Sequence, residues 1–593
     1  MSQAKGKKLI NTVERCVDDS LEGFVAVNPG ARLLQGHRVV VRSDIEEYKA
    51  SGKVAVISGG GSGHEPAHPG YVGRGMLSAA VCGAVFASPP PNSILAGIRA
   101  VGKGNKGGVL LCVANYTGDR LTFGIAFERA KRENINIKMV VVGEDCALTS
   151  ADKSAGRRGM CGFIVTWKLA GALAEEGRPL EEIVSICTEA TQNMGTIGIA
   201  LSPCSLPGQG PTFQLGEDEM ELGLGVHGEA GVKRMKMLTA KETVEAMIAL
   251  MTNKNSSTHL DINKGDKVAV LVNNLGGTSV LELTLMAGEV IRCLENKGVL
   301  VQRAFCGSFM TSLEMAGVIV TVMHLNDVRA KCLDAATSAP GWSPPFLAPG
   351  MTNRETPERM PADDADLSDM IVTSGEGLTV DADTGKLLYS ILKAICETLI
   401  SQESSLNQLD SQTGDGDCGS TLKAGAEGIL KYLGTETSPG LPVTHPQNLL
   451  LSLACLVERW MGGSSGAMYS LFVTAAAAVV AHDVSATGWC SAFQKGMQAI
   501  SKYGGAEPGD RTMLDSMNAA YNTLVANLSS SSPIDAFETA VKAAEQAAAD
   551  TANMTARAGR ASYVSKDLQT QPDAGAVAVS VWLKAIYLTL KKS

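Results

Sequence analysis

A proline-dense segment divides the chain into two halves with different sequence patterns. Residues 340–361 contain six of the 22 prolines in the 593-residue chain, and an acidic stretch follows them. Proline fixes φ and lacks a backbone N–H group, so this segment continues neither a helix nor a sheet and is typical of an extended linker. A chain of this length also exceeds what one hydrophobic core supports. We therefore predict a first domain over 1–339, a linker over 340–372 and a second domain over 373–593.

The first half alternates apolar runs rich in β-branched residues with segments of helix length. The runs cover 53–60, 108–116, 138–144, 267–277, 298–309 and 317–325. Near-continuous apolar strands that alternate with helices are typical of mostly parallel sheets covered on both faces. Because the runs fall into one group before residue 150 and another after residue 260, we predict two α/β subdomains.

The second half has the period of helices. Within residues 385–402, the side chains of Leu388, Leu392, Ile395 and Leu399 recur on one helical stripe. Later alanine-rich segments also read as helices. We predict an all-α domain, either a bundle or a barrel.

The composition of the chain limits the kinds of molecule that it is expected to bind. The net charge of −9 disfavours nucleic-acid binding, which needs clustered Lys and Arg. The longest apolar run, near residue 476, is too short to cross a bilayer, and the first residues lack a signal-peptide pattern. The 14 cysteines include no CxxC pair. We expect a cytoplasmic protein with reduced thiols and a small-molecule partner, without nucleic acid or membrane.

The segment SGGGSGHEPAHPG, residues 58–70, overlaps the end of the first apolar run. Its glycines would let backbone N–H groups approach a ligand at the carboxyl end of a strand, with His64 reaching the same point. The segment lacks the Walker lysine and the GxGxxG spacing. A tight turn with a capping histidine therefore remains an equally good interpretation.

Two other loops of the first half carry candidate catalytic side chains. Asp119, in NYTGD, follows a strand at the sheet edge where ligands gather, although it could instead cap the next helix. His227 lies among glycines in GLGVHGEAG, next to Glu229. Neutral imidazole is a competent nucleophile or base near pH 7, whereas many loop histidines have no chemical role.

The helical half carries a candidate site for a metal nucleotide. Glycines separate three carboxylates that form a compact set of hard oxygen ligands suited to Mg²⁺: Asp410, Asp415 and Asp417. A solvated acidic turn is the alternative. Downstream, a Gly-Ser turn offers a nest for anions, and an arginine follows near the same nucleotide: Ser464, Ser465 and Arg511.

Together these motifs resemble the single-chain dihydroxyacetone kinase family. The resemblance covers nearly the whole chain. It rests on GGGSGHEPAH, NYTGD and GLGVHGEAG before the linker, and on LDxxxGDGDCG, GGSSG and PGDRTMLD after it. The resemblance implies transfer of phosphate from ATP to dihydroxyacetone or D-glyceraldehyde.

The resemblance also implies roles for residues of the first half. In the family, the histidine matching His227 adds to the substrate carbonyl to give a hemiaminal, so glycerol, which has no carbonyl, is rejected. Asp119 matches the carboxylate that contacts a substrate hydroxyl and accepts its proton. His64 would orient or polarise the substrate rather than attack it. The segment that binds the triose matches four residues: Gly61, Ser62, Gly63 and His64.

For the second half, the resemblance implies an eight-helix barrel in which Asp410, Asp415 and Asp417 bind Mg²⁺ with the ATP phosphates. It further implies a homodimer that places the nucleotide domain of one subunit over the substrate domain of the other. The residues that line the nucleotide match a larger set: Asp417, Cys418, Gly419, Ser420, Ser464, Ser465, Gly504, Thr512, Met513, Asp573, Ala574 and Gly575.

Animal members of the family also split FAD into AMP and riboflavin cyclic 4′,5′-phosphate, with Mn²⁺ or Co²⁺ preferred. The resemblance therefore implies FAD as a second substrate. One position departs from the family pattern: relatives carry a lysine immediately before NYTGD, where this chain has Ala114. Because that ammonium would contact the triose, we expect weaker binding or a compensating group. A triose-binding regulatory protein with reduced kinase activity is the alternative function.

Overall fold

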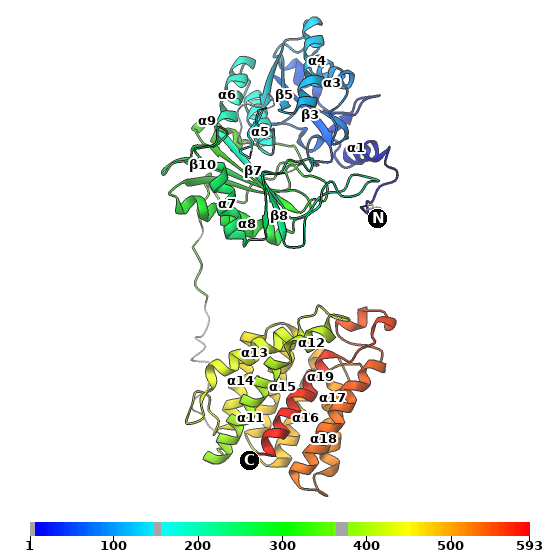
Figure 1. Ribbon diagram of the computed structural model, residues 1–593, viewed down its shortest axis with the longest axis vertical. Helices are drawn as coiled ribbons and strands as arrows, with labels where there is room; N and C mark the ends of the chain where they lie inside the picture. Colours follow the sequence, from blue (N-terminus) through cyan, green and yellow to red (C-terminus); the bar gives the residue numbers. More distant parts are fainter. Residues whose placement is uncertain (1–5, 148–155, 230, 357, 363–376) are drawn as a thin grey trace. The chain divides into compact units, whose positions relative to one another are not determined.

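The computed structural model of the protein describes residues 6–147, 156–229, 231–356, 358–362 and 377–593. The chain forms two compact units, Met1–Glu358 and Arg359–Ser593, and each is described here by itself (Figure 1). Residues 363–372 of the predicted linker lie outside the described residues.

The start of the predicted linker packs with the first unit. Trp342 is 5% exposed, and its ring centroid lies 4.9 Å from that of Phe305. Further on, the backbone N–H of Arg354 donates to the carbonyl oxygen of Gln302 over 2.9 Å. An indole that is removed from water anchors its segment despite the neighbouring prolines. The domain boundaries themselves stay predictions.

The first sheet has six strands in the order β1-β2-β4-β3-β5-β6. β4, β3, β5 and β6 run parallel, as predicted, and the β1-β2 hairpin adds an antiparallel edge. Helices α3 and α4 cover one face, and α5 and α6 cover the other (Figure 1). The bounds are α1 Cys16–Val27, β1 Ala31–Leu33, β2 Val39–Arg42, α2 Ile45–Ala50, β3 Ala55–Ser62, β4 Ala79–Val85, α3 Pro91–Gly102, β5 Val109–Ala114, α4 Thr117–Arg132, β6 Ile137–Val142, α5 Gly162–Glu175 and α6 Leu180–Gln192.

The second sheet also has six strands, in the order β11-β10-β12-β7-β8-β9, but it is not mostly parallel as predicted. Only the β10-β11 pair is parallel among its described pairings. The short segment 308–316 between β11 and β12 has no room for a crossover helix, so the chain returns antiparallel. The bounds are β7 Met194–Ala200, β8 Glu219–Leu222, β9 Lys233–Lys236, α7 Ala240–Met251, β10 Lys267–Asn274, α8 Val280–Asn296, β11 Leu300–Gly307, β12 Gly317–His324 and α9 Asp327–Asp334.

Helix α5 lies between the two sheets and contacts both β3 and β7 (Figure 1). Every residue from Gly162 to Ala174 is buried. A helix that is apolar on all sides is stable only in such a position. The core around α5 accordingly combines side chains of the first sheet, such as Leu110, with side chains of the second, such as Leu271.

The second unit is helical, and its long helices close into a ring (Figure 1). α11 packs on α13, and each later helix packs on the next as far as α19, which returns to α11. With the eight-residue α12 outside this count, the predicted eight-helix barrel is confirmed. The bounds are α11 Ala382–Ser401, α12 Glu403–Asp410, α13 Cys418–Leu433, α14 Pro446–Met461, α15 Gly463–Val480, α16 Ala486–Gly504, α17 Met513–Asn527, α18 Pro533–Asp550 and α19 Ala574–Leu590.

The stripe predicted in the first of these helices faces the core of the ring. Leu392 and Leu399 are buried, and Leu388 and Ile395 are partly buried against the same cluster. The prediction that the apolar run near residue 476 is too short to cross a membrane is wrong by length, because the run is part of the longer helix α15. Among the described helices, α15 alone has the length and composition to cross a membrane, with a mean hydropathy of 1.4. In the ring it packs against α14 and α16.

Two helical glycines allow a matched test of the packing around α5. A Cβ at Gly171 in α5 would lie 2.3 Å from the Cα atom of Met76, whereas a Cβ at Gly23 in α1 would meet nothing within 4 Å. We expect Gly171→Ala to lower the free energy of unfolding by about 1–3 kcal/mol through overpacking. Gly23→Ala should raise it by up to about 1 kcal/mol through helix propensity. Urea unfolding followed by tryptophan fluorescence measures both, and equal stability of the two variants would contradict the central position of α5.

Candidate active site

The glycines of residues 58–70 serve packing within the first sheet. β3 continues to Ser62, further along the chain than the sequence predicted. A Cβ at Gly59 would lie 2.1 Å from the carbonyl oxygen of Val81, and one at Gly61 would lie 2.8 Å from the backbone nitrogen of Ala87. These glycines therefore let β3 approach β4 and the segment that follows it.

The two histidines of this stretch have different environments. His68 is 3% exposed, its ring centroid lies 5.5 Å from that of Trp167, and burial lowers its pKa to about 4. His64 is 1% exposed, and its Nδ1 lies 2.8 Å from the carbonyl oxygen of Thr311. Burial, followed by the charge of His227, lowers the pKa of His64 well below its usual value. The imidazole of His64 is therefore neutral at pH 7.

The tautomer of His64 follows from its partner. A carbonyl oxygen only accepts, so Nδ1 carries the proton and Nε2 carries the lone pair. The Nε2 atom is buried and has no hydrogen-bond partner among the described residues. Because a buried acceptor without a partner is costly, this atom is suited to accept a hydrogen bond from a bound hydroxyl.

His227 lies in the loop after β8 and meets His64 from the second sheet. The ring centroids of His64 and His227 are 4.9 Å apart, edge to face. Phe86 and Tyr116 also pack edge-on against His227, with centroids at 5.3 and 5.0 Å. His227 keeps 24% of its side chain exposed, so a ligand can reach the ring.

Glu229 holds the ring of His227. Nδ1 of His227 lies 3.1 Å from Oε1 of Glu229, and the backbone N–H of His227 donates to Oε2 over 3.0 Å. Burial by itself would raise the pKa of Glu229, but the hydrogen bond and charge of His227 outweigh it and lower the pKa to about 2. The carboxylate is therefore ionised throughout the working pH range.

Asp119 adds a second acceptor without a partner. It lies in the first turn of α4, is 7% exposed, and its Oδ1 has no hydrogen-bond partner among the described residues. Burial raises its pKa, against the hydrogen bond of Ser88 and the charge of His227. Ala114, the last residue of β5, is 5% exposed and supplies no charge. The structure thus brings His64, Asp119 and His227 together from three separate elements.

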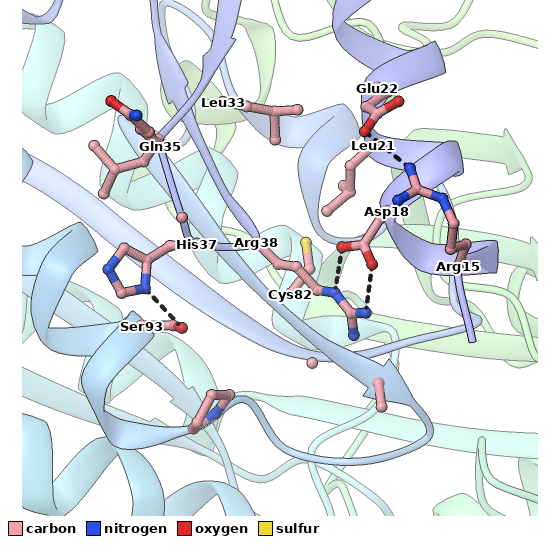
Figure 2. A pocket seen from close by; sticks show the side chains of 15 residues that line it. Arg15, Asp18, Leu21, Glu22, Leu33, Gln35, His37, Arg38, Cys82 and Ser93 are labelled. Atoms are coloured by element: carbon pink, nitrogen blue, oxygen red, sulfur yellow. Dashed lines mark hydrogen bonds and ion pairs between the residues drawn. The ribbon is translucent and has the colours of Figure 1, made fainter.

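A hollow of about 530 Å³ elsewhere in this unit is a different feature (Figure 2). Its charged groups pair with one another: Arg38 donates to Asp18 over 2.7 and 2.8 Å. Nδ1 of His37 lies 3.1 Å from the hydroxyl of Ser93. Among the described residues that line it, none is a predicted site residue. Because its charged groups are already paired, we assign it no ligand.

In the helical unit, the three predicted metal ligands converge. Asp410, Asp415 and Asp417 each offer a carboxylate oxygen, and these atoms lie within 4.8 Å of one another. Oδ2 of Asp410 accepts the backbone N–H groups of Gly416 and Asp417 over 2.9 and 3.1 Å, which fixes the loop. Asp415 also forms an ion pair with Arg560. Three hard oxygen donors at this spacing fit Mg²⁺.

The other predicted nucleotide residues gather at one end of the ring. Gly504 ends α16, and the rest lie at or next to the first residues of α13, α15, α17 and α19: Cys418, Gly419, Ser420, Ser464, Ser465, Thr512, Met513, Asp573, Ala574 and Gly575. A Cβ at Gly575 would lie 3.5 Å from Cβ of Met513, so the starts of α17 and α19 are in contact. Helix N-termini with free N–H groups attract phosphates.

Arg511 holds the backbone next to α19, and one nitrogen of its guanidinium, Nη1, is buried with no hydrogen-bond partner among the described residues. It is 1% exposed, and its guanidinium donates to the carbonyl oxygens of Thr551 and Gln571 over 3.1 and 2.7 Å. It therefore holds the segment that leads into α19. Asp573 begins α19 by accepting the N–H of Ala576 over 2.8 Å, and burial raises its pKa to about 6.

The residues that hold the rings of His64 and His227 were not identified from the sequence. Glu229 stood beside His227 in the sequence, and its two-residue offset was the available signal. Thr311 and Phe86, which contact His64, come from distant loops and carry no motif.

Two family models match the chain, one in each half. The Dak1 domain model matches residues 22–341, and the DAK2 domain model matches residues 412–588. The chain is 47% identical to Triokinase/FMN cyclase of Homo sapiens over 586 residues, covering 99% of each chain.

Two solved structures are also similar. The dihydroxyacetone kinase from C. freundii in complex with AMP-PNP and Mg²⁺ has a TM-score of 0.64 and 32% identity, covering 98% of this chain and 99% of that one. The dihydroxyacetone kinase operon co-activator Dha-DhaQ has a TM-score of 0.51 and 31% identity, covering 56% of this chain and 99% of that one. With both domain models matched in order and a similar relative covering nearly its whole length, the chain belongs to the dihydroxyacetone kinase family.

Proposed function

We propose that this protein is an ATP-dependent kinase of dihydroxyacetone and D-glyceraldehyde that holds its substrate as a hemiaminal on His227. The observation that carries the proposal is the group formed by His64, Asp119 and His227, in which two buried acceptor atoms have no partner among the described residues. A triose supplies both a carbonyl for a nucleophile and hydroxyls for acceptors. The likeness to Triokinase/FMN cyclase over the whole chain supports the same function.

In this mechanism, Nε2 of His227 adds to the substrate carbonyl, and the carbonyl oxygen takes up a proton. Glycerol has no carbonyl and cannot form this bond, so the bond itself gives specificity. Nε2 of His64 accepts a hydrogen bond from a substrate hydroxyl. Asp119 takes the proton of the hydroxyl that receives the phosphate, and the raised pKa of its carboxyl suits that role.

Asp410, Asp415 and Asp417 would hold Mg²⁺, which offsets the charge of the ATP phosphates when bound. The starts of α13, α15, α17 and α19 would bind those phosphates and the rest of the nucleotide through backbone N–H groups, hydroxyls and close packing. The family resemblance that places the nucleotide here is supported by the solved relative that holds AMP-PNP and Mg²⁺.

We further propose that the same nucleotide site splits FAD. The site that binds the ADP part of ATP would bind the ADP part of FAD, with Mn²⁺ or Co²⁺ as the preferred metal. A ribityl hydroxyl then attacks the nearer phosphorus and loses its proton, and AMP leaves with the electrons of the broken P–O bond. The product is riboflavin cyclic 4′,5′-phosphate. The homodimer and the cytoplasmic location also remain proposals.

A pair of variants separates the two activities. His227→Ala should lower dihydroxyacetone phosphorylation by roughly a thousandfold or more because the hemiaminal is lost. FAD cleavage and nucleotide binding should persist. Asp417→Asn should abolish both activities, because its carboxylate would serve one metal site used by both substrates. Asp417 makes no side-chain cap to α13, so the change is structurally mild.

Assays with ATP plus dihydroxyacetone, and separately with FAD, each with Mg²⁺ or Mn²⁺, measure these outcomes. Full triose kinase activity in His227→Ala would contradict the nucleophile assignment. FAD cleavage that survives Asp417→Asn would contradict the shared metal site.

The acidic limb of the pH profile should report Asp119. Burial raises the pKa of Asp119 above its ordinary value of 3.8, and the base must be ionised, so kcat/KM for dihydroxyacetone falls as pH drops through that raised pKa. The pKa of Glu229 is lowered to about 2, so this group titrates at more acidic pH than Asp119. Asp119→Asn should cut kcat/KM by roughly 100-fold or more and remove the limb. An unchanged limb in that variant would assign it to another group.

A second candidate function is a triose-binding regulator. The likeness of the first unit to an operon co-activator and the alanine at position 114 both favour it. The helical unit argues against it, because a regulator needs no cluster of three converging carboxylates.

Ala114→Lys tests the choice between enzyme and regulator. Ala114 of β5 pairs with Val142 of β6. A lysine at position 114 would therefore lie on the same face of the sheet as Glu144, two residues after Val142. The buried Oε2 atom of Glu144 has no hydrogen-bond partner among the described residues. For a kinase, we expect KM for dihydroxyacetone to fall by about 3- to 10-fold, as a charge-assisted contact provides. Ala114→Met, which has similar length and no charge, is the control. A wild-type protein that binds dihydroxyacetone without turnover in any of these assays would favour the regulator.

A further inference from the structure

Both carboxylate oxygens of Glu229 interact with the same residue, His227. Oε2 accepts the backbone N–H of His227 over 3.0 Å, and Oε1 lies 3.1 Å from Nδ1 of the same residue. The imidazole is thereby fixed relative to its own backbone. This pairing holds the ring in a loop where the neighbouring glycines would otherwise allow several orientations.

A buried ion pair lies behind Glu229. Arg158 donates from Nε to Oδ2 of Asp145 over 2.7 Å and from Nη2 to the carbonyl oxygen of Gly223 over 2.8 Å. The side chains of Arg158 and Asp145 are 13% and 1% exposed. Oδ1 of Asp145 also accepts the backbone N–H of Ala147 over 2.8 Å, so the pair is anchored in the first unit.

Glu229 and Arg158 crowd the same glycine. A Cβ built at Gly225 would lie 2.1 Å from Oε2 of Glu229 and 2.7 Å from Nη1 of Arg158. The guanidinium therefore neighbours the carboxylate and favours its ionised form. Only a residue without a side chain at 225 leaves both groups where they are.

We propose that Glu229 is a positioning residue that fixes the tautomer of His227, and that the Asp145–Arg158 pair holds Glu229 in place. The inference rests on the proposed hemiaminal. A carboxylate only accepts, so Nδ1 of His227 carries the proton and Nε2 carries the lone pair. The other tautomer would place a proton on the atom that must attack.

The addition step balances with this assignment. The lone pair of Nε2 forms the C–N bond, and the carbonyl electron pair moves to the oxygen, which takes one proton from solvent. The adduct is then an alcohol carbon attached to an imidazolium that carries one positive charge. The Glu229 carboxylate faces Nδ1–H and offsets that charge.

Glu229→Gln is diagnostic because an amide cannot replace both acceptors. If the amide oxygen accepts the backbone N–H of His227, the NH₂ group faces Nδ1 and moves the ring proton to Nε2. If the amide flips, its NH₂ group meets the backbone N–H instead. Glu229→Asp keeps two acceptor oxygens on a shorter stem and should rescue part of the function.

The control is Glu221→Gln. Glu221 is buried, whereas 37% of the Glu229 side chain is exposed, and Glu221 accepts from the N–H of Gly231 and from Nε of Arg234, each over 3.0 Å, in the same loop region. It makes no hydrogen bond to His227 among the described contacts. The control thus disturbs the loop to a similar extent without touching the ring.

We expect Glu229→Gln to lower kcat/KM for dihydroxyacetone by about 100-fold or more, as loss of a tautomer-setting carboxylate does elsewhere. Glu229→Asp should recover at least tenfold of that loss, and Glu221→Gln should stay within about threefold of wild type. Binding of ADP with Mg²⁺, measured by calorimetry, should be unchanged in all three. Equal losses in Glu229→Gln and Glu221→Gln would reduce Glu229 to a structural role and overturn the proposal.

Direct observation of the ring separates this inference from the proposed function. ¹⁵N spectra of the full-length protein, labelled on histidine and assigned with His227→Ala, should show His227 with its proton on Nδ1. In Glu229→Gln the Nε2–H form should appear. Wild-type protein with the proton on Nε2 would overturn the tautomer assignment whatever the kinase assay gives. If His227→Ala keeps kinase activity while the Nδ1–H tautomer is observed, the hemiaminal fails and the tautomer assignment stands.

Discussion

The burial of α5 between two sheets is the constraint on which the substrate site depends. A buried helix cannot leave its first N–H groups without acceptors. Oε1 of Glu144 meets this need by accepting the N–H groups of Met160 and Gly162 over 2.8 and 2.9 Å. Glu144 follows β6, so the same carboxylate joins the end of the first sheet to the start of α5. Burial raises its pKa to about 7.

A chain of contacts connects Glu144 with the loop that carries His227. Arg157 donates to the carbonyl oxygens of Glu144 and Met194, which links α5 to β7 of the second sheet. The next residue, Arg158, reaches Gly223 just before the His227 loop. Packing that is dictated by an apolar helix therefore fixes the position of a histidine carried by a different sheet. The two sheets therefore bring the loops that carry His64 and His227 into contact.

Many of the strands and helices, and the cluster of aspartates, could be predicted from the sequence because its strongest signals are local. Apolar runs located six of the strands, and the stripe of Leu392 and Leu399 located a core-facing helix. The aspartates that converge in the helical unit lie within one short loop, so their proximity was readable from spacing. Signals of this kind depend on a few neighbouring residues.

The features that could not be predicted from the sequence depend on contacts between distant segments. β12 runs antiparallel to β10 because the connection after β11 is short. The apolar runs alone do not show the direction of each strand. The glycines before His64 predict a ligand cradle, and the structure adds that Gly59 and Gly61 also let β3 approach its neighbours, a contact that the local pattern does not show. Arg511 is predicted near the nucleotide, and its bonds to the carbonyl oxygens of Thr551 and Gln571, which support the segment before α19, could not be read from its charge.

The proposed hemiaminal requires a bond between Nε2 of His227 and the carbonyl carbon of the substrate. The most direct test is NMR of the full-length protein labelled with ¹⁵N-histidine and mixed with [2-¹³C]dihydroxyacetone. We expect a one-bond ¹³C–¹⁵N coupling between the substrate carbon and Nε2 of His227, absent in His227→Ala. Bound substrate whose carbon shows no coupling to any histidine nitrogen would contradict it.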